Sequence, residues 1–274
     1  MVGSLDVHPR VSVSTISSLR LSLDEDLALY GELGISRIGL AMSKMRAYGY
    51  DAAVKRMASH DGSATSICGV NPIRLSDEGG WPEAQRDLLA CAEAATAMHA
   101  STLIVTSGAP DGLTWEEAAT RLSTALAPVM STCAGLGTRI ALEHSNSLRL
   151  DVGFVQTFAD AVDLASELGC GVCMEVSSCW AERGLERTLR RSTGLVDVVQ
   201  VSDYVVGTIC SADRAVPGDG DIPLERILGQ VLDAGYLGLF EIELLGPRIE
   251  AEGYRSAISR AVERTGEILR RLGA

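Results

Sequence analysis

Residues 138–143 read TRIALE, an apolar and β-branched run that ends in a carboxylate. Three later runs repeat this pattern: GVCME (171–175), VDVVQVSD (196–203) and LGLFEIELL (237–245). The polar side chains that the four runs present are Glu143, Glu175, Gln200 and Glu243. A buried strand that presents a polar group at its C-terminal end is how a parallel α/β barrel builds an active site. The four runs therefore predict one shared site at one end of a barrel.

Strand-like and helix-like segments alternate along almost the whole chain. The strand-like segments are continuous apolar runs, which is typical of parallel strands that are buried on both faces. Eight such strands favour an α/β fold, a single (β/α)8 TIM barrel that forms one domain over residues 1–274. An open doubly wound sheet is the alternative. The predicted strands cover residues 11–15, 36–42, 63–70, 101–108, 138–143, 169–175, 195–203 and 236–244.

Several residues mark where helices start and stop. Gly34 and Gly135 follow helix-like stretches and are predicted to end them, and Asp221 precedes another and is predicted to cap its start. Two connections between a strand and the next helix are long: residues 42–47 and residues 203–221. Both follow strand ends, so we expect them on the same face as the four polar side chains, where long loops usually serve binding.

Composition limits the classes of partner. The net charge is −12, and the only lysines are Lys44 and Lys55, so a nucleic-acid-binding surface is not expected. No apolar run is long enough for a membrane span and the first residues resemble no signal peptide. Seven cysteines, mostly in apolar runs, indicate reduced thiols and a cytoplasmic protein. Cys170 and Cys173 lie within one predicted strand, so they should face opposite sides and share no site.

The polar set has a clear chemical preference. Three carboxylates and one amide make a hard, all-oxygen ligand set. Such a set suits a divalent metal such as Mg, Mn or Co, and Zn less well.

Four motifs carry a resemblance to a known family. IALEHSN (140–146), VVQVSDYV (198–205), ADRAVPGDGDIPLERIL (212–228) and GYLGLFEIELLGPR (235–248) resemble signatures of the xylose isomerase-like TIM-barrel superfamily. This superfamily is the sugar phosphate isomerase/epimerase group, which includes hydroxypyruvate isomerase. The resemblance implies a metal held by the four polar side chains. It also implies that the first and last glutamates, Glu143 and Glu243, are the catalytic acid/base pair.

The implied activity is a metal-dependent isomerase or epimerase that moves a proton next to the carbonyl of a small sugar-like or α-hydroxycarbonyl substrate. Two positions depart from the family, which has Asp on the sixth strand and His three residues later. Here these positions hold Glu175 and Ser178. The departures leave two alternatives open: a metal-dependent lyase or dehydratase on a cyclic hydroxylated substrate, and a non-catalytic barrel whose metal site has decayed. The partner expected is a small molecule, and a homo-oligomer stays open.

Five residues are predicted to contact substrate, and three of them have a simpler alternative. Asn146 can instead cap its loop, and Arg214 can pair with Asp213 or Asp219. Lys44 can be a solvated loop residue. His144 is expected to face away from Glu143. The predicted substrate contacts are Lys44, Asn146, Ser178, Asp203 and Arg214.

Overall fold

The eight strands form one closed barrel. The computed structural model describes residues 5–210 and 212–274. Each strand pairs in parallel with the next, and β8 pairs with β1. This closure confirms the (β/α)8 prediction and excludes the open sheet. The strands are β1 Val11–Ser14, β2 Arg37–Ala41, β3 Ser63–Gly69, β4 Thr102–Thr106, β5 Arg139–Glu143, β6 Gly171–Glu175, β7 Val196–Val201 and β8 Phe240–Ile242.

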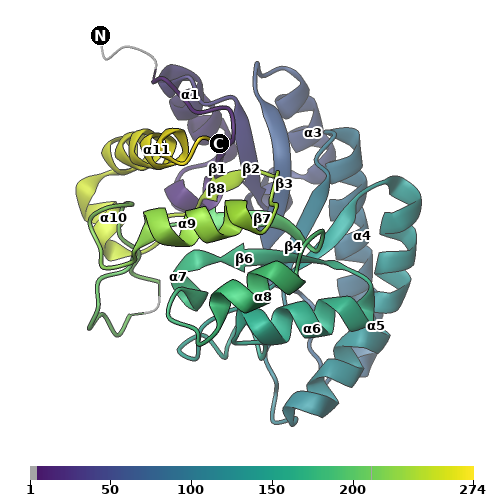
Figure 1. The fold of residues 1–274 in the computed structure, drawn as a ribbon. Helices are drawn as coiled ribbons and strands as arrows, with labels where there is room; N and C mark the ends of the chain where they lie inside the picture. Colours follow the sequence, from purple (N-terminus) through teal and green to yellow (C-terminus); the bar gives the residue numbers. More distant parts are fainter. Residues whose placement is uncertain (1–4, 211) are drawn as a thin grey trace.

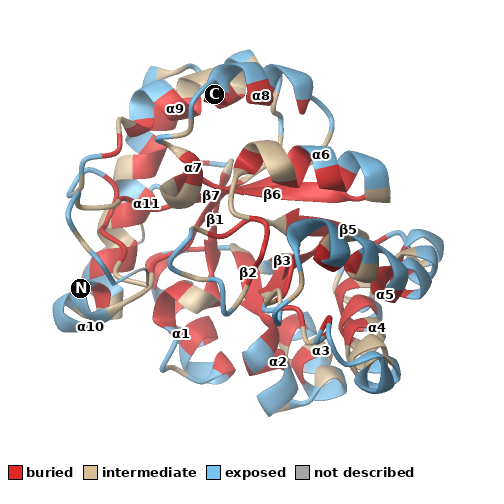
Figure 2. Cartoon of the chain, turned by 90° about the horizontal axis from the view of Figure 1, so that it is seen from below, coloured by how far each residue is buried: buried red, intermediate tan, exposed pale blue. Residues whose placement is uncertain are grey.

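Helices surround the strands and bury one face against them (Figure 1). Figure 2 shows the result: the strands at the centre are buried, and the helices are exposed on their outer faces. The helices are η1 Thr15–Ser18, α1 Leu23–Leu33, α2 Met42–Tyr48, α3 Tyr50–Ala58, η2 Glu78–Gly80, α4 Trp81–Ala97, α5 Trp115–Leu136, α6 Phe158–Leu168, α7 Val176–Cys179, α8 Leu185–Arg191, α9 Leu224–Asp233, α10 Pro247–Glu252 and α11 Tyr254–Arg271. Within the described ranges, no helix is both long and apolar enough to cross a bilayer.

The helix ends follow the local chemistry of the sequence. Gly34 takes a left-handed conformation with φ 77° and ends α1, as predicted. The prediction for Gly135 is wrong, because α5 continues to Leu136 and Gly137 takes the left-handed conformation instead, with φ 79°. Asp221 does not cap α9: its carboxylate accepts a hydrogen bond from the backbone N–H of Val206, at 2.7 Å.

The predicted loop at residues 42–47 is instead a helix, α2. Met42 and Met45 are buried, and they lie three residues apart on one helix face. Ala41 precedes the helix and offers no side-chain cap, so the start of α2 carries no sequence signal. The other long connection, between β7 and α9, is a loop as predicted.

Two apolar clusters fill the protein. The larger one lies between the strands and the helices and includes Cys170. The smaller one includes Cys173, so the two cysteines of this pair face opposite sides of β6, as predicted. The smaller cluster joins side chains of five strands, β3 to β7, as expected for the barrel interior. Its buried members are Cys68, Ile104, Ala141, Cys173 and Val198.

Candidate metal and substrate site

Three of the predicted acidic residues meet at the C-terminal ends of the strands. Glu143 ends β5, Glu175 ends β6, and Glu243 follows β8 directly. One carboxylate oxygen from each lies within 4.8 Å of the others. Glu175 and Glu243 are buried, whereas Glu143 keeps partial exposure. Parallel strands bring their ends to one rim of the barrel, which is why residues 100 positions apart in the sequence become neighbours.

Gln200 joins this acidic group from β7. The backbone register pairs it with Glu175 on one side and Glu241 on the other. Its side-chain Nε2 donates a hydrogen bond to Glu243 Oε2 at 2.6 Å. Its Oε1 is buried and has no hydrogen-bond partner in the described part of the chain. The amide therefore orients one acid and leaves an oxygen lone pair available.

Glu175 contacts two different groups with its two carboxylate oxygens. Its Oε1 accepts a hydrogen bond from the backbone N–H of Ser177 at 2.9 Å and so caps the short helix α7. Its Oε2 lies 2.7 Å from a guanidinium nitrogen of Arg214, without the alignment of a hydrogen bond. The Glu175 carboxylate thus contacts the start of α7 with one oxygen and the buried Arg214 guanidinium with the other.

Arg214 comes from the long loop after β7 and reaches into the acidic group. Besides its contact with Glu175, it donates a hydrogen bond to Ser202 Oγ at 3.0 Å and lies 3.9 Å from Glu243 Oε1. Asp213 and Asp219, which were its alternative partners, pair instead with arginines of α10 and α11. The guanidinium therefore faces the site and does not form an ion pair within its own loop.

The environment strongly favours protonation of the acids. Burial, together with the charge of Glu175, raises the pKa of Glu143 to about 7. Burial and the neighbouring charges of Glu143 and Glu175 raise the pKa of Glu243 well above its usual value. The nearby Glu241 carboxyl also has its pKa raised to about 7, mainly by burial. Acids with raised pKa values at neutral pH suit proton transfer.

The residues present fit a divalent cation. The donors are carboxylate oxygens and one amide oxygen, the ligands that Mg and Mn prefer. Oε1 of Gln200 lacks a partner, and Oε2 of Glu175 lacks an aligned donor, in the part of the chain described here. Burial and the neighbouring carboxylates raise the pKa values of Glu143 and Glu243, although the charge of Arg214 acts to lower them. A bound cation would supply the missing positive charge.

The sequence reasoning missed two residues beneath the acidic group. Glu241 lies on β8, two residues before Glu243, and accepts a hydrogen bond from Ser66 Oγ at 2.6 Å. Side chains two apart on a strand share a face, so the alternation in FEIE was a usable signal. Cys68, on β3, lies 3.5 Å from Glu143 Oε2 and 3.6 Å from Gln200 Nε2. Burial raises the pKa of this thiol well above its usual value, so it stays protonated.

A cavity of about 400 Å³ opens above the acids, a size typical of small-molecule sites. Three of the predicted substrate contacts line it: Asn146, Ser178 and Arg214. Asn146 also caps its own loop, because its Oδ1 accepts a hydrogen bond from the backbone N–H of Leu148 at 3.0 Å. Lys44 and Asp203 do not line this cavity.

The structure places these last two residues away from the cavity. Lys44 is not a solvated loop residue: it is 8% exposed, and its ammonium group pairs with Asp26 at 2.6 Å and donates to the Ser18 carbonyl at 2.9 Å. Asp203 is fully buried and accepts four backbone N–H hydrogen bonds, which tie the loop after β7 to itself. These bonds come from Tyr204 (2.8 Å), Gly218 (2.8 Å), Gly220 (3.1 Å) and Ile222 (3.0 Å).

His144 follows Glu143 but packs outward against Phe158 of α6, with ring centroids 5.8 Å apart. Its Nε2 accepts a hydrogen bond from the backbone N–H of Glu175 at 3.2 Å, which places the proton of the neutral ring on Nδ1. Burial lowers the pKa of His144 to about 3, so the ring is neutral. It therefore links the ends of β5 and β6 and does not act as a charged group.

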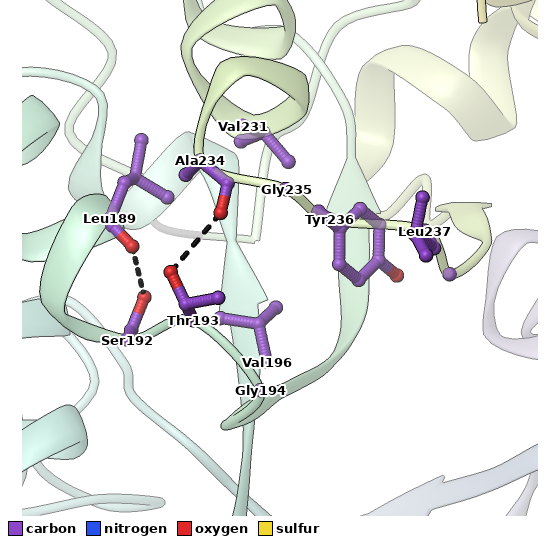
Figure 3. A pocket seen from close by; sticks show the side chains of 11 residues that line it. Leu189, Ser192, Thr193, Gly194, Val196, Val231, Ala234, Gly235, Tyr236 and Leu237 are labelled. Carbon is purple, nitrogen blue, oxygen red and sulfur yellow. Dashed lines mark hydrogen bonds between the residues drawn. The ribbon is translucent and has the colours of Figure 1, made fainter.

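A second cavity lies outside the barrel, where α8 and α9 approach the starts of β7 and β8 (Figure 3). The hydroxyls of Ser192 and Thr193 already donate to backbone carbonyls of Leu189 and Ala234. The hydroxyl of Tyr236 donates to another carbonyl, at 2.6 Å. None of the described residues that line this cavity is a carboxylate, histidine or cysteine, so the barrel mouth is the candidate site.

Comparisons with known proteins agree with this fold. An inosose isomerase from Halalkalibacterium halodurans is 25% identical over 140 residues, which are 48% of this chain and 49% of that protein. The chain thus spans about half the length of the curated relative it matches. A structure of a protein from Sinorhizobium meliloti 1021 superposes with a TM-score of 0.83 at 21% identity, covering 95% of this chain and 98% of the other. The IOLI protein with a binding zinc atom gives a TM-score of 0.81 at 18% identity, covering 96% and 98%.

The family assignment comes from the sequence itself. A family model described as xylose isomerase-like TIM barrel matches residues 30–264, which include seven of the eight strands. The motifs of the second half predicted this family. The chain belongs to the xylose isomerase-like TIM-barrel family.

Proposed function

We propose that this protein is a divalent-metal-dependent isomerase or epimerase, which moves a proton on the carbon next to the carbonyl of a small α-hydroxycarbonyl compound. The observation that carries the proposal is the group formed by Glu143, Glu175 and Glu243, whose oxygens lie within 4.8 Å of one another. The group lies at the barrel end where enzymes of this fold place their active sites. The inosose isomerase relative supports the same class of reaction. One domain over residues 1–274 is part of the proposal.

Four residues would hold the cation: Glu143, Glu175, Gln200 and Glu243. Their all-oxygen donor set favours Mg, Mn or Co. When bound, the cation would stabilise negative charge that develops on the substrate oxygens. Arg214 would support the same task from the loop side, because its planar guanidinium can hold an oxygen anion through two N–H groups.

Glu143 and Glu243 are the proposed proton carriers. They line the cavity from the end of β5 and from the residue that follows β8. Burial raises the pKa of both carboxyls, to about 7 for Glu143, which favours uptake of a proton by each. Gln200 fixes the orientation of Glu243 through the 2.6 Å hydrogen bond. Asn146 and Ser178 remain the proposed contacts to the rest of the substrate.

The test combines metal analysis with isotope exchange. Protein purified without chelators should contain about one divalent metal per chain. In deuterated water it should incorporate deuterium at the carbon next to the carbonyl of a hydroxymethyl ketone, measured by NMR. Glu243→Gln should abolish this exchange and keep the thermal unfolding midpoint, whereas Glu225→Gln, an exposed control, should change neither.

Two outcomes would reject the proposal. Exchange at the parent rate in Glu243→Gln would remove its proton-transfer role. A protein without metal and without exchange would be a barrel whose site has decayed. Loss of water from the substrate, visible as a mass change of the product, would instead identify a dehydratase.

A further inference from the structure

The walls of the cavity above the acidic group are largely apolar. Ile16 and Leu19 line one side, from η1 and the residue that follows it, and Val70 follows β3. Val152 and Leu245 line it from the second half of the chain. Leu19 is 47% exposed and Val70 is 51% exposed, so apolar surface is available to a ligand rather than packed in the core.

The charged residues at the rim are already engaged. The Nε of Arg46 donates to Asp87 at 2.8 Å. The guanidinium of Arg149 donates to both carboxylate oxygens of Asp151, at 2.9 Å and 3.0 Å. A substrate hydroxyl that used either arginine would have to share it with an existing carboxylate partner.

Three of the five serine, threonine and asparagine side chains that line the wall already make hydrogen bonds. Ser145 Oγ donates to the Gly153 carbonyl at 3.2 Å, and Thr106 Oγ1 accepts from the backbone N–H of Asn71 at 3.3 Å. Oδ1 of Asn146 holds its own loop. Ser43 and Ser178 are lining residues whose hydroxyls make no hydrogen bond within residues 5–210 and 212–274.

This distribution separates two kinds of substrate. A polyhydroxylated chain needs a partner for each hydroxyl that it buries, and an unmade hydrogen bond is costly. A hydrocarbon chain needs only apolar contact, and each buried methylene strengthens binding about fourfold. The acidic group and Arg214 can serve one carbonyl and one hydroxyl, but the wall above them offers few further polar partners.

We infer that the substrate carries its α-hydroxycarbonyl group at one end and an apolar part at the other. The polar end faces Glu143, Glu243 and Arg214, and the apolar end lies against Leu19 and Val70. The inference rests on the proposed function, because it assigns the acidic group to the reacting end. It distinguishes this chain from an enzyme for free sugars, whose ligands are hydroxylated along their whole length.

The test uses hydroxymethyl ketones with methyl, ethyl, propyl and butyl tails. D-fructose is the matched comparison, because it has the carbon skeleton of the butyl ketone with hydroxyls added. Binding to the manganese-loaded protein is measured by calorimetry, and deuterium incorporation by NMR. The Kd should fall about fourfold for each added methylene, and the butyl ketone should bind more tightly than D-fructose.

Two variants test whether the preference for long apolar tails arises at the cavity wall. Val70→Ser should reduce the preference for the butyl over the methyl ketone by about fivefold, since it replaces apolar wall with a hydroxyl. Leu237→Ser is the matched control, because Leu237 is 89% exposed and lines the other cavity. It should leave this preference unchanged.

The outcomes separate the inference from the proposed function. Deuterium exchange with D-fructose and tighter binding of D-fructose than of the butyl ketone would overturn the inference and leave the proposed function standing. An equal Kd for all four ketones would also overturn it. Neither metal binding nor exchange with any compound would reject the proposed function and the inference together.

Discussion

Asp203→Asn is expected to lower the free energy of unfolding by about 3 kcal/mol. The buried carboxylate accepts two backbone N–H groups on each oxygen: Tyr204 and Ile222 on Oδ1, Gly218 and Gly220 on Oδ2. Asparagine keeps one oxygen and replaces the other with an NH₂ group, so two of the four bonds are lost. A hydrogen bond to a charged acceptor contributes about 1.5 kcal/mol or more, which gives the stated total.

The assay is denaturant unfolding followed by circular dichroism, with the parent protein measured beside the variant. Asp213→Asn is the matched control, because it makes the same change on the same loop. The Asp213 side chain accepts one backbone N–H, from Arg248 at 3.1 Å, and its ion pair with that arginine is partly exposed. We expect a loss of about 1 kcal/mol or less for the control.

The result also decides between two roles for Asp203. If the carboxylate were a substrate contact, as the sequence suggested, Asp203→Asn would raise KM and leave the unfolding free energy within about 0.5 kcal/mol of the parent value. That outcome would refute the loop-anchoring role. A loss no greater than that of Asp213→Asn would refute it equally.

Three further changes test other parts of the structure. Lys44→Met should lower the free energy of unfolding by about 3–5 kcal/mol, because it leaves the buried Asp26 without its partner. Adding Asp26→Leu should recover part of this loss, measured by denaturant unfolding. No loss in the single variant would argue against the ion pair. Gly39→Ala should lower the free energy of unfolding by about 1–3 kcal/mol, because the new Cβ would overlap the Glu241 carboxylate. A stability equal to that of the parent would show that the Glu241 side chain can move aside. The free energy of unfolding should fall as the pH drops through about 6.5, because burial lowers the pKa of His8 in the folded state and the unfolded chain takes up the proton first. His8→Gln should flatten that pH dependence. An unchanged pH profile in this variant would contradict the role of His8.

The sequence predicts the barrel well because its signal is distributed over many residues. Each strand is an apolar run between helices, so an error at one boundary does not alter the topology. Helix α2 was not predicted because Ala41, the residue before it, offers no side-chain cap, and only the buried Met42 and Met45 mark a helix face. The end of α5 lies two residues later than predicted, because Gly135 and Gly137 are equally suited to stop a helix and it is Gly137 that takes the left-handed conformation.

The candidate site is predictable only in part. Strand-end positions identify Glu143 and Glu243, because parallel strands bring their ends together whatever the loops do. Loop residues have no strand register that fixes their neighbours. The partner of Arg214 therefore could not be predicted from the sequence, and Asp203 was predicted to contact substrate. Glu241 was missed although its spacing from Glu243 places both on one face of β8.

The cavity wall and the acidic group come from different stretches of the chain. Much of the apolar wall lies before residue 71, whereas the proposed proton carriers and metal ligands all lie from Glu143 onward. Random mutagenesis confined to the codons for residues 15–70 would therefore alter which molecules enter while the reacting groups stay intact. Such a library offers a route to new selectivity in which no proposed proton carrier or metal ligand is replaced.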